Sequence, residues 1–128
     1  MKSPLETRLE IDLSALKHNF EVIKSRLKPQ TKIMGVVKAF AYGSESVVVA
    51  KRLEQLGVSY LATAYINEGV RLRKAGISCP ILIFYPQLKE IYQLLKYELT
   101  PSVYSFYFLK SLHQNLKQKG IKNFPIHL

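Results

Sequence analysis

The sequence predicts an α/β fold in which helices alternate with the strands of a parallel sheet. Apolar segments typical of buried strands begin near residues 33, 58, 81, 99 and 125, at intervals of roughly 18 to 26 residues. Between them lie segments whose apolar residues recur every three or four positions, as on one face of a helix. A regular strand-helix rhythm builds parallel sheets, because the crossover helix carries the chain back to the start of the next strand.

The first helix is expected directly after Asp12. Leu9 and Ile11 alternate with acidic residues, and the apolar period then lengthens to between three and four. Asp12 stands where a side chain can cap the helix N-terminus, and the Lys-Pro pair at 28–29 ends the helix. The apolar stripe consists of Leu13, Leu16, Phe20, Ile23 and Leu27. Residues 33–37 follow as a strand without polar alternation, which we expect to be covered on both faces.

Two further units follow the first strand. Ser44 is placed to cap a helix that ends at Gly57, where a left-handed residue is favoured. Residues 58–64 are typical of a strand, and a short helix then extends to Gly76. Residues 80–85, Pro-Ile-Leu-Ile-Phe-Tyr, predict another buried strand.

The last units are less regular. Residues 88–95 carry a helical stripe, and residues 99–104 predict a weaker strand because they contain a proline, which cannot donate a ladder hydrogen bond. A final helix over residues 109–116 is stopped by Gly120. Residues 125–128 begin one more strand.

Two architectures share this rhythm: a small doubly wound open sheet, and a (β/α)₈ barrel, which typically needs about 250 residues. Residues 1–128 contain no low-complexity segment or linker, so we expect a single domain. The sequence ends inside the apolar segment 125–128, which would leave a sheet edge uncovered. We therefore expect this domain to be incomplete.

The composition argues against several classes of function. No segment approaches the roughly 18 apolar residues of a membrane span, and the first ten residues lack the apolar middle of a signal peptide, which predicts a cytoplasmic protein. The single cysteine, Cys79, cannot form an internal disulfide, and the three histidines show no metal-ligand spacing. The net charge of +10 is spread along the predicted helices, so we interpret it as solvated helix faces rather than a nucleic-acid surface.

The segment with the most chemical content is residues 34–44, Met-Gly-Val-Val-Lys-Ala-Phe-Ala-Tyr-Gly-Ser. Lys38 ends a buried strand, so its stem lies among apolar neighbours, with Met34 and Val36 on the same face, while its amine reaches the rim where parallel α/β folds build their sites. An amine in such surroundings is a usable nucleophile. Tyr42 follows in a tight turn and is placed to donate its hydroxyl to a phosphate or to the lysine. On residue types alone a second interpretation stays open, in which the lysine reaches solvent beside a tyrosine packed on the rim.

Residues 36–43, Val-Val-Lys-Ala-Phe-Ala-Tyr-Gly, resemble the cofactor signature of the alanine racemases, which are fold-type III pyridoxal-phosphate enzymes. In that signature Val-Val-Lys-Ala is followed by a residue pair and then Tyr-Gly. The similarity continues in the family's order and spacing and covers essentially residues 5–128. The further matching segments are residues 9–16 with His18-Asn19, 62–69, 72–77 and 80–83.

The resemblance implies that the chain is the N-terminal half of a (β/α)₈ barrel, without the other half and a C-terminal β-domain. It implies that Lys38 carries pyridoxal 5'-phosphate covalently and is the base on one face of the substrate Cα, and that Tyr42 contacts the cofactor phosphate and the lysine. The chain departs from the family pattern in three places. Phe40 replaces an asparagine, Ser44-Glu45 replaces His-Gly, and Phe84 stands where an aliphatic residue is usual. These departures alter the hydrogen bonding expected around the site.

The resemblance also implies a function. The parent protein would interconvert L- and D-alanine for peptidoglycan synthesis as a homodimer, in which the other subunit's β-domain supplies the second proton donor. The 128-residue chain by itself is expected to be inactive. Two alternatives remain: a pyridoxal-phosphate-binding homeostasis protein of the same barrel type, whose lysine segment usually lacks the Ala-Tyr-Gly seen at residues 41–43, and a basic α/β binding module for nucleic acid or phosphorylated partners.

Overall fold

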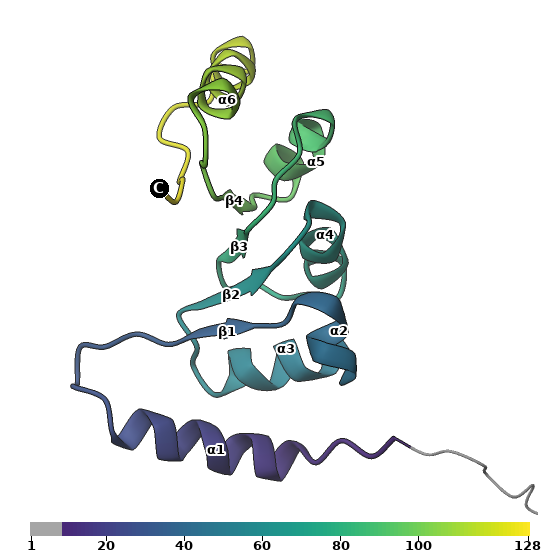
Figure 1. The fold of residues 1–128 in the computed structure, drawn as a ribbon, viewed down its shortest axis with the longest axis vertical. Helices are drawn as coiled ribbons and strands as arrows, with labels where there is room; N and C mark the ends of the chain where they lie inside the picture. The colour runs from purple at the N-terminus through teal and green to yellow at the C-terminus, as the bar shows by residue number, and fades with distance from the viewer. Residues whose placement is uncertain (1–8) are drawn as a thin grey trace, which may run out of the picture.

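The computed structural model describes residues 9–128. The first helix begins as the sequence predicts, because the Asp12 carboxylate accepts hydrogen bonds from the N–H groups of Ser14 at 2.7 Å and Ala15 at 3.1 Å. Helices and strands then alternate along the chain (Figure 1). In order, the elements are α1 (Leu13–Ser25), β1 (Met34–Val36), α2 (Lys38–Gly43), α3 (Ser46–Gln55), β2 (Tyr60–Thr63), α4 (Ile66–Lys74), β3 (Ile81–Ile83), η1 (Leu88–Glu90), α5 (Ile91–Lys96), β4 (Thr100–Pro101) and α6 (Phe106–Gln118).

The strands form one parallel sheet in the order β1-β2-β3-β4, so each strand lies beside the one that precedes it in the sequence (Figure 1). The register pairs Gly35 with Leu61 and Leu61 with Ile81. Beyond β4, Ser102 forms a parallel bridge with His127. The C-terminal apolar segment therefore pairs with the sheet where the sequence predicts one more strand.

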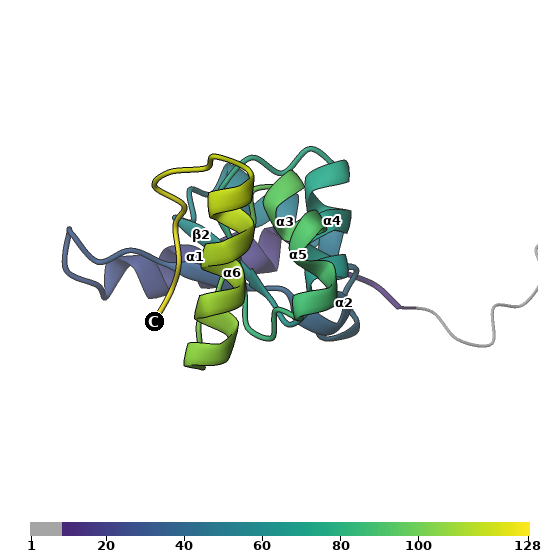
Figure 2. The same cartoon turned by 90° about the horizontal axis from the view of Figure 1, so that it is seen from above.

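The helices α3, α4 and α5 lie on one side of the sheet (Figures 1 and 2). The register between β1, β2 and β3 puts Gly35 and Ile83 on the same face. α3 packs on that face at Gly35 of β1, where an added Cβ would lie 2.8 Å from the side chain of Leu53 in α3. α4 packs on the same face through its own Gly69, where an added Cβ would lie 2.8 Å from the side chain of Ile83 in β3. A doubly wound sheet reverses its strand order and carries helices on both faces, so this arrangement is that of a barrel segment.

The core lies between the sheet and this helix layer. Its fully buried side chains include Val37, Leu61, Ile66, Leu72, Ile81, Ile83, Leu94, Leu99, Phe108 and Leu112. On the opposite face of β1, Met34 is 39% exposed and Val36 is 37% exposed. The expectation that residues 33–37 are covered on both faces is therefore wrong, because the helices pack on one face only.

Element boundaries differ from the sequence prediction in several places, three of which follow. Glu45, not Ser44, caps α3, and its carboxylate accepts the N–H of Val47 at 3.2 Å. The helix expected over residues 88–95 begins as the 3₁₀ turn η1 before it becomes α5. The strand expected over residues 99–104 is reduced to the two residues of β4, which agrees with the limited pairing that its proline allows.

α1 packs against α3 at the β1 end of the sheet, and α6 lies beyond β4 (Figure 1). Phe20 is the side chain of α1 that is buried. Within residues 9–128, no helix is long and apolar enough to cross a lipid bilayer. The parallel order gathers the carboxyl ends of all four strands at one edge, which is where parallel α/β folds form their sites.

Candidate functional site

Lys38 follows β1 directly and lies at the carboxyl edge of the sheet. Val37, the residue before it, is buried and donates its N–H to the carbonyl of Ala62 at 2.9 Å, which fixes the strand end. The Lys38 side chain is half-buried, and its Nζ lies 6.0 Å from the centre of the Phe84 ring. The place of the lysine agrees with the sequence prediction, and Phe84, one of the departures noted above, is a neighbour of its amine.

Residues 39–42 form a left-handed helical turn, drawn as α2 (Figure 1). Ala39, Phe40, Ala41 and Tyr42 have φ between 50° and 57° and ψ between 37° and 52°. This conformation costs an L-residue roughly 1–2 kcal/mol, so other contacts must hold it. Ala41 is buried, and its N–H donates to the carbonyl of Val37 at 3.1 Å. The sequence predicts a tight turn here, but it gives no sign of four successive left-handed residues without a glycine.

Tyr42 is the exposed end of this turn, with 69% of its surface accessible. It shares the carboxyl edge with Lys38, although no hydrogen bond joins the two side chains within residues 9–128. Tyr65 follows β2 and Tyr85 follows β3, with ring centres 6.4 Å apart, and Tyr104 follows β4. Each strand end thus carries an exposed tyrosine. An edge lined by aromatic side chains beside an amine suits a flat, polar ligand ring.

Glu68 of α4 connects the left-handed turn to the next strand. Its Oε1 accepts the N–H of Ala39 at 2.7 Å, and its Oε2 accepts the N–H groups of Ala64 at 2.8 Å and Tyr65 at 3.0 Å. The residue after the lysine is therefore tied to the end of β2. Sequence reasoning missed Glu68. The available signal was a glutamate at the third position of a predicted helix, from which a carboxylate reaches back to the backbone before the helix.

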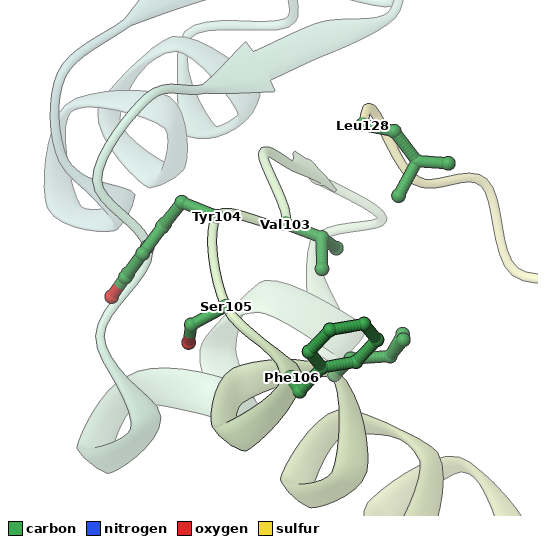
Figure 3. A pocket seen from close by; sticks show the side chains of 6 residues that line it. Val103, Tyr104, Ser105, Phe106 and Leu128 are labelled. Carbon is green, nitrogen blue, oxygen red and sulfur yellow. The ribbon is translucent and has the colours of Figure 1, made fainter.

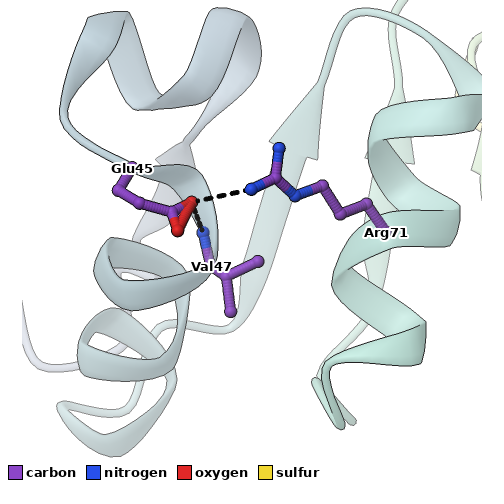
Figure 4. A network of polar contacts seen from close by, with 3 residues as sticks. All are labelled: Glu45, Val47 and Arg71. Atoms are coloured by element: carbon purple, nitrogen blue, oxygen red, sulfur yellow. Dashed lines mark hydrogen bonds and ion pairs between the residues drawn. The ribbon is translucent and has the colours of Figure 1, made fainter.

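Arg71 lies one turn further along α4 and contacts the same segment. Its Nη2 is 3.1 Å from Oε1 of Glu45, which also accepts the N–H of Val47 (Figure 4). Its guanidinium carbon lies 4.5 Å from the centre of the Phe40 ring, within the range of a cation–π contact. Phe40 and Glu45, two of the departures from the family pattern, therefore meet at one arginine. Sequence reasoning missed Arg71 as well.

A hollow with a mostly apolar lining lies away from Lys38. Its volume is about 260 Å³, and it is found beyond β4, between the start of α6 and the end of the chain (Figure 3). It is lined by Val103, Tyr104, Ser105, Phe106, Leu109 and Leu128. The hollow contains no charged side chain. In the part of the chain that the structure describes, no group of three or more His, Cys, Asp or Glu residues is placed to hold a metal ion.

Residues 11–128 match the family model described as the N-terminal domain of alanine racemase. The chain belongs to the alanine racemase family. The resemblance seen in the sequence is therefore confirmed. The chain is 41% identical over 124 residues to alanine racemase 1 of Caldanaerobacter subterraneus subsp. tengcongensis, covering 95% of the chain and 31% of that protein. It is 42% identical over 120 residues to an alanine racemase of Methanococcus maripaludis, covering 93% of the chain and 32% of that protein.

Solved alanine racemases share the fold. The structure from Clostridium difficile 630 in complex with cycloserine superposes with a TM-score of 0.86 at 38% identity, over 91% of this chain and 32% of that one. The structure from Bartonella henselae, which holds covalently bound pyridoxal phosphate, superposes with a TM-score of 0.80 at 25% identity, over 91% of this chain and 34% of that one. This racemase-family chain spans about a third of the length of the relatives that it matches. Its α/β sheet is the N-terminal part of the racemase barrel, as the sequence predicts.

Proposed function

We propose that the protein to which this chain belongs is a pyridoxal-phosphate-dependent alanine racemase in which Lys38 binds the cofactor. The observation that carries the proposal is the place of Lys38 at the carboxyl end of β1, followed by Tyr42, in a chain of the alanine racemase family. The relatives compared above are alanine racemases, and the Bartonella henselae protein holds pyridoxal phosphate covalently.

The residues around Lys38 fit this cofactor. Its half-buried amine is a group that can form a covalent bond to an aldehyde. Phe84 gives the half-buried side chain an apolar neighbour. The exposed hydroxyl of Tyr42 is a donor that a phosphate oxygen accepts, and Tyr65 and Tyr85 supply aromatic surface at the same edge.

In this proposal Lys38 has two tasks. Its amine would hold the cofactor, and its free Nζ would remove or return the proton on one face of the substrate Cα. Pyridoxal phosphate, when bound, supplies an electron sink that makes this proton easier to remove. Inversion requires a second proton donor on the opposite face. By family resemblance this donor is a tyrosine in the C-terminal β-domain of the other subunit, which supports a homodimer.

We further propose that alanine is the substrate, that its D-form serves peptidoglycan synthesis, and that the protein is cytoplasmic. Residues 1–128 would form one domain that is an incomplete barrel, to which the later barrel strands and the β-domain are added in the whole protein. The coverage of about a third of each relative supports this division. The spread of the basic residues over several helices argues against nucleic acid as a partner.

Covalent labelling tests the role of Lys38. We would mix the protein expressed from its complete gene with pyridoxal phosphate, reduce it with borohydride and map the modified peptide. We expect the label on Lys38, none in Lys38→Ala, and full labelling in the control Lys32→Ala, because Lys32 is an exposed lysine outside the strand end. A label on another lysine in the unmodified protein would contradict the assignment.

The same preparation separates the alternative functions. We expect the complete gene product to interconvert L- and D-alanine and the 128-residue chain alone to be inactive. Labelling of Lys38 without racemisation by the complete gene product would favour a homeostasis protein of the same barrel type. Salt-dependent binding of a polyanion, unchanged in Lys38→Ala and without any cofactor labelling, would favour the basic binding module.

A further inference from the structure

The left-handed turn of residues 39–42 needs support from outside itself. Four successive L-residues in this conformation are unfavourable, and none of them is a glycine. The turn directly follows the cofactor lysine of the proposed function and contains Tyr42. Its conformation therefore decides where the Lys38 amine and the Tyr42 hydroxyl stand relative to each other. Two residues that contact it from outside, Glu68 and Arg71, lie on one helix, α4.

Glu68 provides the first support. One carboxylate oxygen accepts the N–H of Ala39, and the other accepts the N–H groups of Ala64 and Tyr65. Because all three partners are backbone groups, the contact fixes the main chain itself rather than a side chain. It joins the strained turn to the end of β2, which is part of the sheet. A charged acceptor makes stronger hydrogen bonds than a neutral one, so these bonds are suited to hold an unfavourable conformation.

Arg71 provides the second support, three residues after Glu68 and thus on the same side of α4. Its guanidinium lies over the Phe40 ring at 4.5 Å and pairs with Glu45 at 3.1 Å. Phe40 lies inside the turn, and Glu45 caps the helix that follows it. The arginine therefore contacts both the turn and its exit. Each contact is partly solvated and weak alone, but together they restrict the turn from two directions.

We propose that Glu68 and Arg71, here called the α4 pair, are positioning residues for the cofactor lysine. They hold the left-handed turn and so set the spacing between the Lys38 amine and the Tyr42 hydroxyl. The inference rests on the proposed function of Lys38. The α4 pair does not touch the reacting atoms, and it acts through the backbone of residues 39–42. Phe40 and Glu45 form one set with Arg71, so the departures at these two positions act together.

The variants are Glu68→Gln and Arg71→Gln in the complete gene product. Glutamine keeps the size of Glu68 but turns one acceptor into a donor, so at least one of the three N–H groups loses its partner. Glu54→Gln is the matched control for Glu68, because Glu54 also accepts three hydrogen bonds but at the opposite end of the sheet. Lys74→Gln is the control for Arg71, because Lys74 is an exposed cation on the same helix.

Two readouts are measured: amide hydrogen exchange of residues 39–42 without cofactor, and the dissociation constant for pyridoxal phosphate. We expect Glu68→Gln to speed exchange about tenfold and to weaken cofactor binding about tenfold, because it loses one charged hydrogen bond. We expect Arg71→Gln to change each readout about threefold, because it loses one exposed ion pair. Both controls should leave the two readouts unchanged. In a Phe40→Asn background, Arg71→Gln should have a smaller effect, because one of its contacts is already gone.

The two readouts keep the inference separate from the proposed function. If the unmodified protein labels at Lys38 but Glu68→Gln changes neither exchange nor binding relative to Glu54→Gln, the positioning role is wrong and the proposed function stands. If Glu68→Gln lowers the melting temperature as much as Glu54→Gln and leaves exchange at residues 39–42 unchanged, the inference is equally overturned. If Glu68→Gln speeds exchange but the unmodified protein does not take up pyridoxal phosphate at Lys38, the stabilisation of the turn by Glu68 is supported and only the proposed function is contradicted.

Discussion

Glu54 and Glu68 show how one kind of residue serves two ends of this sheet. Oε1 of Glu54 accepts the N–H of Ser78 at 2.7 Å, the hydroxyl of Ser78 at 2.9 Å and the N–H of Cys79 at 2.7 Å. These contacts close the loop before β3, at the amino edge, where residues of parallel α/β folds contribute to stability. Glu68 makes an equivalent set of bonds at the carboxyl edge, next to Lys38. Bonding pattern alone therefore does not separate a structural from a functional carboxylate, and position does.

The carboxylate of Glu54 makes the free energy of unfolding depend on pH in the acid range. Burial raises the pKa of its carboxyl, but the N–H groups of Cys79 and Ser78 outweigh this effect, and the net pKa is below the ordinary value. Its stabilisation is therefore fully present above the pKa of an unfolded glutamate, about 4.3, and is lost as the pH falls through the lower native value. We expect Glu54→Gln to be less stable at pH 7 and to lose less further stability between about pH 5 and pH 3. Urea unfolding across this pH range measures the free energy of unfolding of the unmodified protein and of Glu54→Gln. The same dependence on pH in both proteins would contradict the prediction.

At the residue scale, the place of Lys38 at a strand end could be predicted from the sequence, whereas the partners of Glu68 and Arg71 in the preceding turn could not. The lysine ends an apolar run, and the strand end is a local feature that the neighbouring residues reveal. Glu68 bonds to Ala39, which is 29 positions away. Such a contact exists only because the ends of β1 and β2 lie side by side. The contacts of Arg71 with Phe40 and Glu45 depend on the same approach.

At the scale of elements, α4 is positioned on the sheet by Gly69. An added Cβ would stand 2.8 Å from Cδ1 of Ile83 and 3.1 Å from Cδ1 of Leu99, and both side chains are fully buried. Helix propensity favours alanine over glycine by about 1 kcal/mol, but overpacking of a core costs about 1–3 kcal/mol. We expect Gly69→Ala to destabilise the fold by about 1 kcal/mol and to shift α4 outward.

Denaturant unfolding of Gly69→Ala, with Lys74→Ala as the control, measures whether overpacking outweighs the gain in helix propensity. Lys74 is exposed on the same helix, so its substitution should change the unfolding free energy by less than about 0.5 kcal/mol. A gain of stability in Gly69→Ala would mean that the sheet accommodates the methyl group and that helix propensity dominates. Because Glu68 and Arg71 flank Gly69, an outward shift of α4 should also loosen the left-handed turn.

The elements themselves were largely predictable, with one exception. Apolar period located α1, α3, α4 and α6, Asp12 marked the start of α1, and apolar runs located β1, β2 and β3, because these signals are local. The turn of residues 39–42 was not predictable, since alanine, phenylalanine and tyrosine have no preference for positive φ. Its contacts with Glu68 and Arg71 come from α4, far along the chain, and Glu45 rather than Ser44 caps α3.

For the whole molecule, the sequence does not decide between an open doubly wound sheet and a barrel segment. Both architectures have the same composition and the same alternation of strands and helices. The choice is made by the strand order and by which face carries the helices, and both depend on how successive units pack. The uniform order β1 to β4 and the helices on one side leave β1 with an uncovered face, on which Met34 and Val36 lie, whereas Ala62 and Leu82 on the same side of the sheet are buried. In a closed barrel this face is the interior.

This uncovered face gives a prediction that differs between the short chain and the complete gene product. Exposed apolar side chains beside a free sheet edge promote association, so the isolated 128-residue chain should form oligomers with rising concentration. Val36→Ser should reduce this association. In the complete gene product the same residue would lie inside the barrel, and Val36→Ser should then cost about 1–3 kcal/mol of unfolding free energy, because a buried hydroxyl replaces two packed methyl groups. Sedimentation velocity of the short chain and denaturant unfolding of the long one measure the two effects. If Val36→Ser is neutral in the complete gene product, the uncovered face of β1 does not become a barrel interior, and the placement of this chain within a closed barrel is wrong.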